Sequence, residues 1–87
     1  MNKEYRIPTV LSQIMVELDR AETKHPDWPN DIIHAAAIVG EESGELTRAA
    51  LQFTYEDGRR EDAEKEAIQV AVTAIRFLEG LNCYRKE

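Results

Sequence analysis

Between Asp31 and Phe53, apolar residues recur every seven positions and no proline interrupts them. A seven-residue repeat keeps one stripe of an α-helix against a neighbouring helix, as in helical bundles. Asn30 can cap such a helix, because its side chain can accept from the first free N–H groups. We therefore predict a helix from Asp31 to about Phe53 and an all-α fold. The repeat consists of Ile32, Val39, Leu46 and Phe53.

Upstream, the segment 25–30 carries two prolines and cannot continue a helix, because proline lacks an N–H and restricts the residue before it. Before it we predict a helix from about Thr9, which follows Pro8 and can act as its cap, to Thr23. The apolar residues at helical spacing in this segment are Leu11, Ile14, Met15, Leu18 and Ala21.

Downstream, the pair Asp57-Gly58 predicts a turn. A third helix is expected from about Arg60 to Glu79, with Gly80 as its C-cap and a frayed tail over 82–87. The chain is thus expected to form a single domain, residues 1–87, built as a bundle of three main helices.

The apolar surface of the third helix is wider than two helices of the same chain would cover. It includes Ala63, Ala67, Val70, Ala71, Ala74, Ile75, Leu78 and Leu81. A domain this small is also marginally stable alone. We therefore expect a homodimer or homotetramer that completes a bundle of four or more helices, against the alternative of a monomeric three-helix bundle.

The composition excludes several classes of protein. Eleven basic and seventeen acidic residues give a net charge of −6, which argues against nucleic-acid binding. A single cysteine, Cys83, excludes an internal disulfide and a multi-cysteine zinc site. No segment approaches the ~20 apolar residues of a membrane span, and the first residues do not read as a signal peptide. The expectation is a cytoplasmic protein without a membrane partner.

Four side chains have the spacing of a cation site. Glu42 and Glu45 lie three residues apart, hence about 60° apart on a helix, and Glu66 and Gln69 repeat this spacing on the next helix. In an antiparallel hairpin the four converge, and oxygen ligands favour Mg²⁺ or Mn²⁺. The alternative is a solvated acidic surface in which Arg48 pairs with Glu45 or Glu41, and Lys65 with Glu61. Only one histidine, His25, follows a glutamate (Glu22) by three residues, whereas a di-iron bundle needs two such pairs, which argues against a di-iron bundle.

The segment Glu41-Glu42-Ser43-Gly44-Glu45-Leu46, followed about twenty residues later by Glu66-Ala67-Ile68-Gln69, resembles the MazG-like all-α nucleotide pyrophosphohydrolases. Their pattern is EExxE on one helix and ExxD on the next. The resemblance covers roughly residues 9–81 and includes a leading helix and a loop with tryptophan and proline.

The resemblance implies a Mg²⁺-dependent enzyme, with Mn²⁺ able to substitute, that cleaves nucleoside triphosphates between the α and β phosphates to a monophosphate and pyrophosphate. By position, Glu42, Glu45 and Glu66 would be metal ligands, and Glu41 would orient or deprotonate the attacking water. Gln69 stands where the family has an aspartate; it can still offer a neutral oxygen but cannot act as a base.

Substrate contacts are expected from Trp28, His34, Arg48 and Lys65. Trp28, just before the motif helix, can stack on a nucleobase or close the end of the bundle. His34 can contact substrate or remain a surface group. The cationic side chains from which phosphate contacts would come are Lys24, Arg48, Arg59, Arg60, Lys65 and Arg76.

Two alternative functions follow from the same residues. A phosphoribosyl-ATP pyrophosphohydrolase would share the fold family and the carboxylates. A catalytically silent oligomerisation or binding module is the other, because Gln69 removes one negative charge from the predicted cage.

Overall fold

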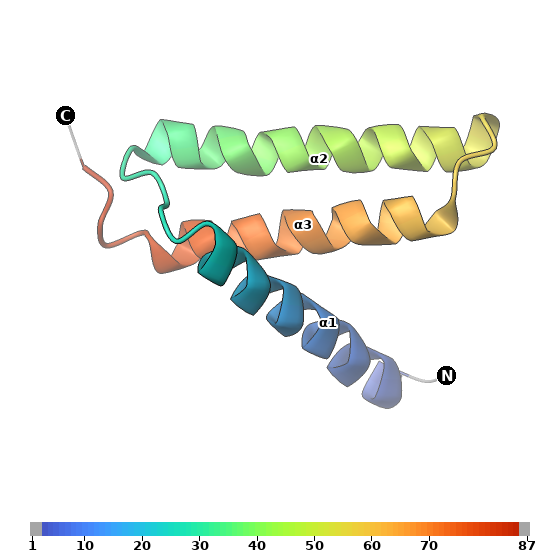
Figure 1. Cartoon of the computed structure of the whole chain (residues 1–87), viewed down its shortest axis with the longest axis horizontal. Helices are drawn as coiled ribbons and strands as arrows, with labels where there is room; N and C mark the ends of the chain where they lie inside the picture. Colours follow the sequence, from blue (N-terminus) through green and yellow to red (C-terminus); the bar gives the residue numbers. More distant parts are fainter. Residues whose placement is uncertain (1–2, 86–87) are drawn as a thin grey trace.

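The computed structural model describes residues 3–85, the side chain of Tyr5 excepted, and folds them into three α-helices. These are α1 (Lys3–Lys24), α2 (Ile32–Tyr55) and α3 (Arg60–Glu79) (Figure 1). No strand occurs within the described range, so the prediction of an all-α, three-helix chain is confirmed. None of the helices in this range is both long and apolar enough to cross a membrane.

Helices α2 and α3 form an antiparallel hairpin (Figure 1). The predicted turn is present: Asp57 adopts a positive φ of 65°, and the Gly58 N–H donates to the Gln52 carbonyl at 2.8 Å. A Cβ atom at Gly58 would lie 2.7 Å from the Gln52 carbonyl carbon, so only glycine fits there. The predicted bounds of α3, with Gly80 as its C-cap, are confirmed.

Helix α2 is capped by Asp31 rather than by Asn30. The Asp31 carboxylate accepts from the backbone N–H of Ile33 at 2.8 Å and of His34 at 3.3 Å. An ionised carboxylate accepts these bonds well and also complements the positive end of the helix. The helix then continues two residues beyond Phe53, to Tyr55.

The predicted start of α1 is wrong. The helix begins at Lys3 and contains Pro8, so Thr9 lies inside it instead of capping it. Pro8 is the sixth residue of the helix, so its position would otherwise donate an N–H within the helix, and α1 continues through Pro8 at the cost of that one hydrogen bond. At the other end the helix reaches Lys24, and the His25 N–H donates to the Ala21 carbonyl at 2.8 Å.

The expected fraying of the tail is also wrong as far as the described residues extend. The Tyr84 hydroxyl donates to the Phe77 carbonyl at 3.0 Å and accepts from the Trp28 indole N–H at 2.8 Å. The Arg85 N–H donates to the Asn30 carbonyl at 3.2 Å. The tail is therefore anchored to the loop between α1 and α2; residues 86–87 lie outside the described range.

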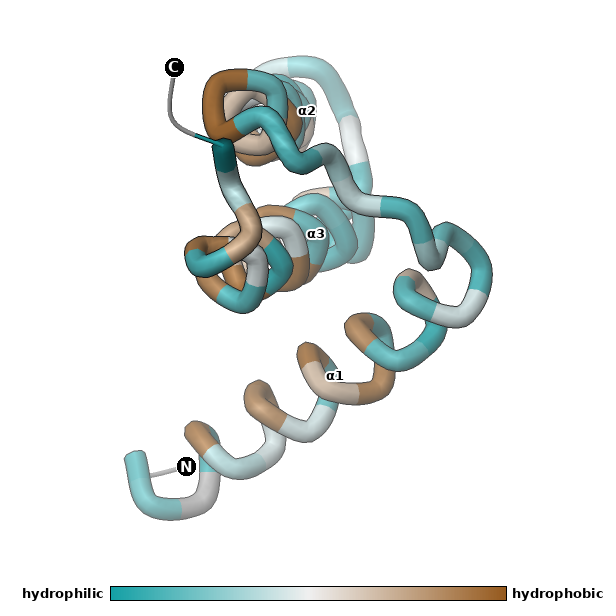
Figure 2. The backbone as a smooth tube through the Cα atoms, turned by 90° about the vertical axis from the view of Figure 1, so that its left-hand side faces the viewer, coloured by the Kyte–Doolittle hydropathy of each residue, from teal (hydrophilic) through white to brown (hydrophobic). Residues whose placement is uncertain are grey.

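Helix α1 packs on α3 and has no packing contact with α2 (Figures 1 and 2). The buried residues of the described chain are correspondingly few and mostly small: Leu18, Ala35, Ala49, Val72 and Thr73. On α2 the buried positions are not those of the predicted repeat, whose ends Ile32 and Phe53 are exposed. The tightest contact with α3 runs through Ala35 and Ala49, and Glu42 lies midway between them.

Candidate metal centre

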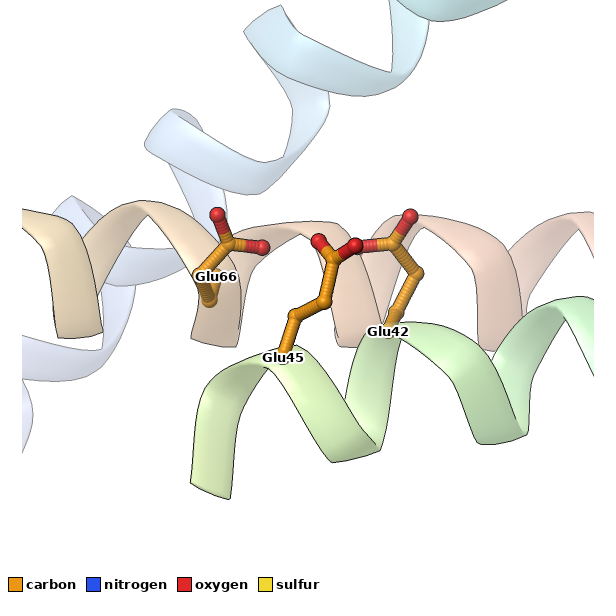
Figure 3. Close-up of side chains that lie close together, drawn as sticks. All are labelled: Glu42, Glu45 and Glu66. Atoms are coloured by element: carbon orange, nitrogen blue, oxygen red, sulfur yellow. The ribbon is translucent and has the colours of Figure 1, made fainter. Parts of the chain in front are cut away.

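Three glutamates from the two hairpin helices converge on one point. Glu42 and Glu45 come from α2 and Glu66 from α3, and one carboxylate oxygen of each lies within 4.8 Å of the other two. Figure 3 shows the three carboxylates projecting together from the hairpin, toward the side on which α1 crosses. Glu42 and Glu66 are half-buried and Glu45 is exposed. The structure therefore brings these three side chains together, as the sequence predicted.

The positions of these glutamates follow from the packing of α2. Ala35, Glu42 and Ala49 are seven residues apart and so share the stripe that faces α3. The alanines, which are fully buried, let the two helix backbones approach each other. Glu42 then occupies a position that in most bundles is apolar, and its carboxylate is partly removed from water. Glu45, one turn further, extends from the same side to reach Glu66.

The closeness of the carboxylates raises the proton affinity of Glu42 and of Glu66. Partial burial, and then the charges of Glu45, Glu66 and Glu41, raise the pKa of Glu42 above its ordinary value. The pKa of Glu66 is raised by partial burial, by the charge of Glu45 and by a hydrogen bond with that carboxyl group. Both partial burial and the neighbouring carboxylates thus disfavour the ionised forms of Glu42 and Glu66.

No side-chain cation forms an ion pair with the cluster within the described residues, although the charge of Lys65 acts to lower the pKa of Glu66. The ion pairs there join Arg20 to Glu17 and Arg59 to Glu61. The pairing of Arg48 with Glu45 or Glu41, which the spacing allows, does not form in this range, and Glu61 pairs with Arg59 rather than with Lys65. A solvated surface with internal ion pairs therefore does not account for the cluster.

The donor set fits a hard divalent cation. Oxygen ligands about 2.1 Å from a Mg²⁺ ion stand roughly 3–4 Å from one another. The three oxygens here lie within 4.8 Å of one another, so small side-chain rotations, easiest for the exposed Glu45, bring them to one ion. Carboxylate oxygens without nitrogen or sulfur favour Mg²⁺ or Mn²⁺ over zinc.

Gln69, the fourth predicted ligand, is directed to α1. Its amide nitrogen donates to the Glu17 carboxylate at 2.7 Å. Glu17 also accepts from the Arg20 guanidinium at 2.9 and 2.7 Å. The hydrogen bond from Arg20, and then that from Gln69, lowers the pKa of Glu17 from 4.5 to about 2, against the opposing effect of partial burial. Gln69 thus links α1 to the helix that carries Glu66.

Sequence reasoning did not single out Glu17. The only signal was its spacing of three residues from Arg20, which predicts an ion pair on one helix face. The contact with Gln69 joins residues 52 positions apart and depends on how α1 crosses α3, which no local pattern encodes.

The remaining predicted residues lie around the cluster or away from it. Glu41 is exposed next to Glu42, and its charge is one of those that raise the pKa of Glu42. Arg48 and His34 are exposed on α2, His34 in its first turn. Lys65 is exposed on α3, beside Glu66, and lines a groove between α1 and α3 together with Gln69.

Trp28 serves to close the end of the bundle. Its indole N–H donates to Tyr84, and the Arg76 guanidinium lies over its ring, 4.9 Å from the ring centre. Arg76 in turn donates to the His25 carbonyl at 2.7 Å. The side chain is half-buried by these contacts. Of the two roles that the sequence allowed for Trp28, these contacts favour packing over stacking on a nucleobase.

The fold and the site together define a helical protein with a three-carboxylate cluster between two antiparallel helices. Comparison with known proteins finds no family model that matches the chain, and neither a curated protein nor a solved structure that is significantly similar. The function is therefore argued from the site itself.

Proposed function

We propose that the chain is a Mg²⁺-dependent nucleotide pyrophosphohydrolase that cleaves nucleoside triphosphates between the α and β phosphates. The observation that carries the proposal is the convergence of Glu42, Glu45 and Glu66 without an ion pair to a cationic side chain in the described residues. The choice of substrate rests on the resemblance of the two glutamate motifs to the MazG-like enzymes. Mn²⁺ would substitute for Mg²⁺, because it prefers the same oxygen ligands.

In this proposal Glu42, Glu45 and Glu66 hold the cation. Bound there, Mg²⁺ would neutralise phosphate charge and activate a water molecule. Glu41, exposed beside the cluster, would orient that water or accept its proton. Gln69 contributes indirectly, because its hydrogen bond to Glu17 fixes α1 on the side toward which the carboxylates project.

A triphosphate carries about four negative charges and needs cationic contacts beyond the metal. Arg48 and Lys65 are exposed on the two helices that carry the cluster, free of the ion pairs found in the described residues, and would supply these contacts. His34 is exposed at the start of α2 and would contact the nucleoside. The partners in this proposal are the nucleotide and further copies of the chain, and not nucleic acid, because the net charge is −6.

The test is the release of pyrophosphate from a panel of ribo- and deoxyribonucleoside triphosphates with Mg²⁺. Wild-type protein is expected to release pyrophosphate and a monophosphate, and Glu45→Gln is expected to lose this activity. Glu56→Gln is the matched control, because Glu56 is an exposed glutamate at the end of α2 outside the cluster. Release of single phosphate would contradict the proposed cleavage.

One observation favours a second candidate function, a catalytically silent binding module. Gln69 replaces a charged ligand of the family pattern, and its amide is engaged by Glu17. In that case the protein would bind Mg²⁺ and turn over no nucleotide, phosphoribosyl-ATP included. Turnover of phosphoribosyl-ATP alone would instead identify the related pyrophosphohydrolase.

A further inference from the structure

The segment that follows α3, residues 81–85, lies at the same end of the hairpin as the loop between α1 and α2 (Figure 1). Tyr84 bonds this segment to two other parts of the chain. Its hydroxyl accepts from the Trp28 indole N–H of the loop at 2.8 Å and donates to the Phe77 carbonyl of α3 at 3.0 Å. A phenolic hydroxyl has one proton to donate, so Tyr84 uses both its donor and its acceptor capacity here.

Gly80 shows that the sequence provides a place for Tyr84. The backbone at Gly80 has φ −82° and ψ −4°, a right-handed conformation that residues with side chains also adopt. The conformation therefore does not require glycine. A Cβ atom there would lie 2.8 Å from the Tyr84 hydroxyl oxygen and 3.0 Å from the ring carbon that bears it. The absence of a side chain at Gly80 thus makes room for the end of the Tyr84 ring.

From Trp28 the contacts continue to the end of α1. The Arg76 guanidinium lies over the Trp28 ring, 4.9 Å from the ring centre, a favourable place for a cation. The same guanidinium donates to the His25 carbonyl at 2.7 Å. His25 is the first residue after α1. A chain of contacts therefore runs from Tyr84 through Trp28 and Arg76 to the C-terminus of α1.

The rest of α1 is only loosely packed. It packs on α3 alone and diverges from it toward the N-terminus (Figure 1). Leu18 is the one buried residue of α1 among those described, the side chain of Tyr5 excepted, and Leu11 on the same face is 54% exposed. Gln13 and Glu17 add hydrogen bonds to α3. Since apolar burial is what usually fixes a helix on its neighbours, the position of α1 depends strongly on the contacts at its C-terminus.

We propose that residues 81–85 are a latch for α1. With Tyr84 in place, the loop between α1 and α2 is fixed and α1 is held on the hairpin; with Tyr84 displaced, the loop is released and α1 moves relative to the hairpin. The Arg85 N–H, which donates to the Asn30 carbonyl at 3.2 Å, is a second attachment of the same segment to the same loop.

The latch bears on the glutamate cluster through the position of α1. The three carboxylates project toward the side on which α1 crosses (Figure 3). All three belong to α2 and α3, so release of α1 uncovers that side of the hairpin without separating the carboxylates. This inference does not rest on the proposed function.

The first test uses Trp28, the single tryptophan of the chain, as a fluorescent reporter of the loop. Tyr84→Phe removes the hydroxyl and keeps the ring. Its Trp28 emission is expected to shift to longer wavelength, and acrylamide is expected to quench it more strongly, because the loop is released to water. Tyr55→Phe removes a hydroxyl from a residue that is 78% exposed at the end of α2, and is expected to match the wild type. Wild-type emission from Tyr84→Phe overturns the proposal.

The second test separates a latch from a general loss of stability by amide hydrogen exchange. In Tyr84→Phe the amides of α1 are expected to exchange about fivefold faster or more, the factor by which loss of a hydrogen-bond partner shifts a local opening equilibrium. The amides in the middle of α2 and α3 are expected to keep their wild-type rates. Unchanged exchange in α1, or equal acceleration in all three helices, contradicts the latch.

A second variant tests the latch without removing a hydrogen-bonding group. Gly80→Ala places a methyl group where the end of the Tyr84 ring lies, in a backbone conformation that alanine adopts. It is expected to shift the Trp28 emission and to accelerate exchange in α1 as Tyr84→Phe does. Because both changes open the same latch, the double variant is expected to exchange no faster than the faster single variant. Fully additive effects would show two independent contacts and would refute the proposal.

Discussion

The two sides of α2 differ in the kind of partner that they lack. One side collects Glu42 and Glu45 beside Glu66, and no cationic side chain among the described residues forms an ion pair with them. The other side carries no charge and remains exposed. A single helix thus offers concentrated charge in one direction and apolar surface in the other. The small core of the chain thus accounts for only a few positions of α2, and the other positions divide into a charged side and an uncharged side.

The largest effect is expected on the charged side. Glu45→Gln keeps the size of the side chain and removes one of the three charges. Even loss of a residue that supports a metal ligand costs roughly 10–100-fold in activity or affinity, so loss of a ligand is expected to lower kcat/KM for the triphosphate by about 100-fold or more. Steady-state pyrophosphate release at saturating Mg²⁺ measures this.

The control for that experiment is Glu56→Gln, which lies outside the cluster and is expected to retain wild-type activity. Equal loss in the two variants would contradict a special role for Glu45. A wild-type rate in Glu45→Gln would remove it from the site altogether.

A smaller effect is expected where α1 joins α3. Glu17→Gln replaces a charged acceptor of the Arg20 and Gln69 hydrogen bonds. Hydrogen bonds to charged groups contribute about 1.5–3 kcal/mol each in favourable cases, and we expect a loss of about 1–2 kcal/mol in the free energy of unfolding. Urea denaturation at pH 7 measures it, and an unchanged midpoint would contradict the proposed link.

The same residue gives a pH dependence of known sign. The pKa of Glu17 is lowered from 4.5 to about 2, so the folded state binds fewer protons than the unfolded state between these values. The stabilisation by Glu17 is therefore complete above about pH 4.5 and is lost as the pH falls toward 2. Glu17→Gln is expected to remove this part of the acid destabilisation.

The smallest effect concerns the cluster without metal. The pKa values of Glu42 and Glu66 are raised, so the folded state binds more protons and the stability of the metal-free protein falls as the pH rises through these values. Glu42→Gln is expected to raise the unfolding free energy at pH 7 in the presence of a chelator, by about 0.5–1 kcal/mol. Thermal unfolding checks this; a lower stability of Glu42→Gln under these conditions would show that the charges do not oppose the fold.

Much of the hairpin was predictable because its signals are local. Asp57-Gly58 marks the turn, and the spacing of Glu42, Glu45 and Glu66 on an antiparallel hairpin is sufficient to bring the three together. Pro8 misled the prediction of α1, because proline commonly marks a helix start, whereas here the helix begins five residues earlier and continues through it.

The rest depends on contacts between distant residues. The direction of the Gln69 amide is set by Glu17, and the order of the tail is set by Tyr84 bonding to Trp28 and Phe77. Gln69 and Glu17 are 52 positions apart and Tyr84 and Trp28 are 56 apart, and no local spacing predicts these contacts.

The central claim, that Glu42, Glu45 and Glu66 bind a divalent cation, is tested most directly by titration with Mn²⁺ followed by electron paramagnetic resonance. The signal of free Mn²⁺ reports how many ions each protein removes from solution. The account predicts saturable binding by the wild type and by Glu56→Gln, and its loss in Glu45→Gln. Equal, non-saturating uptake by all three proteins would contradict it.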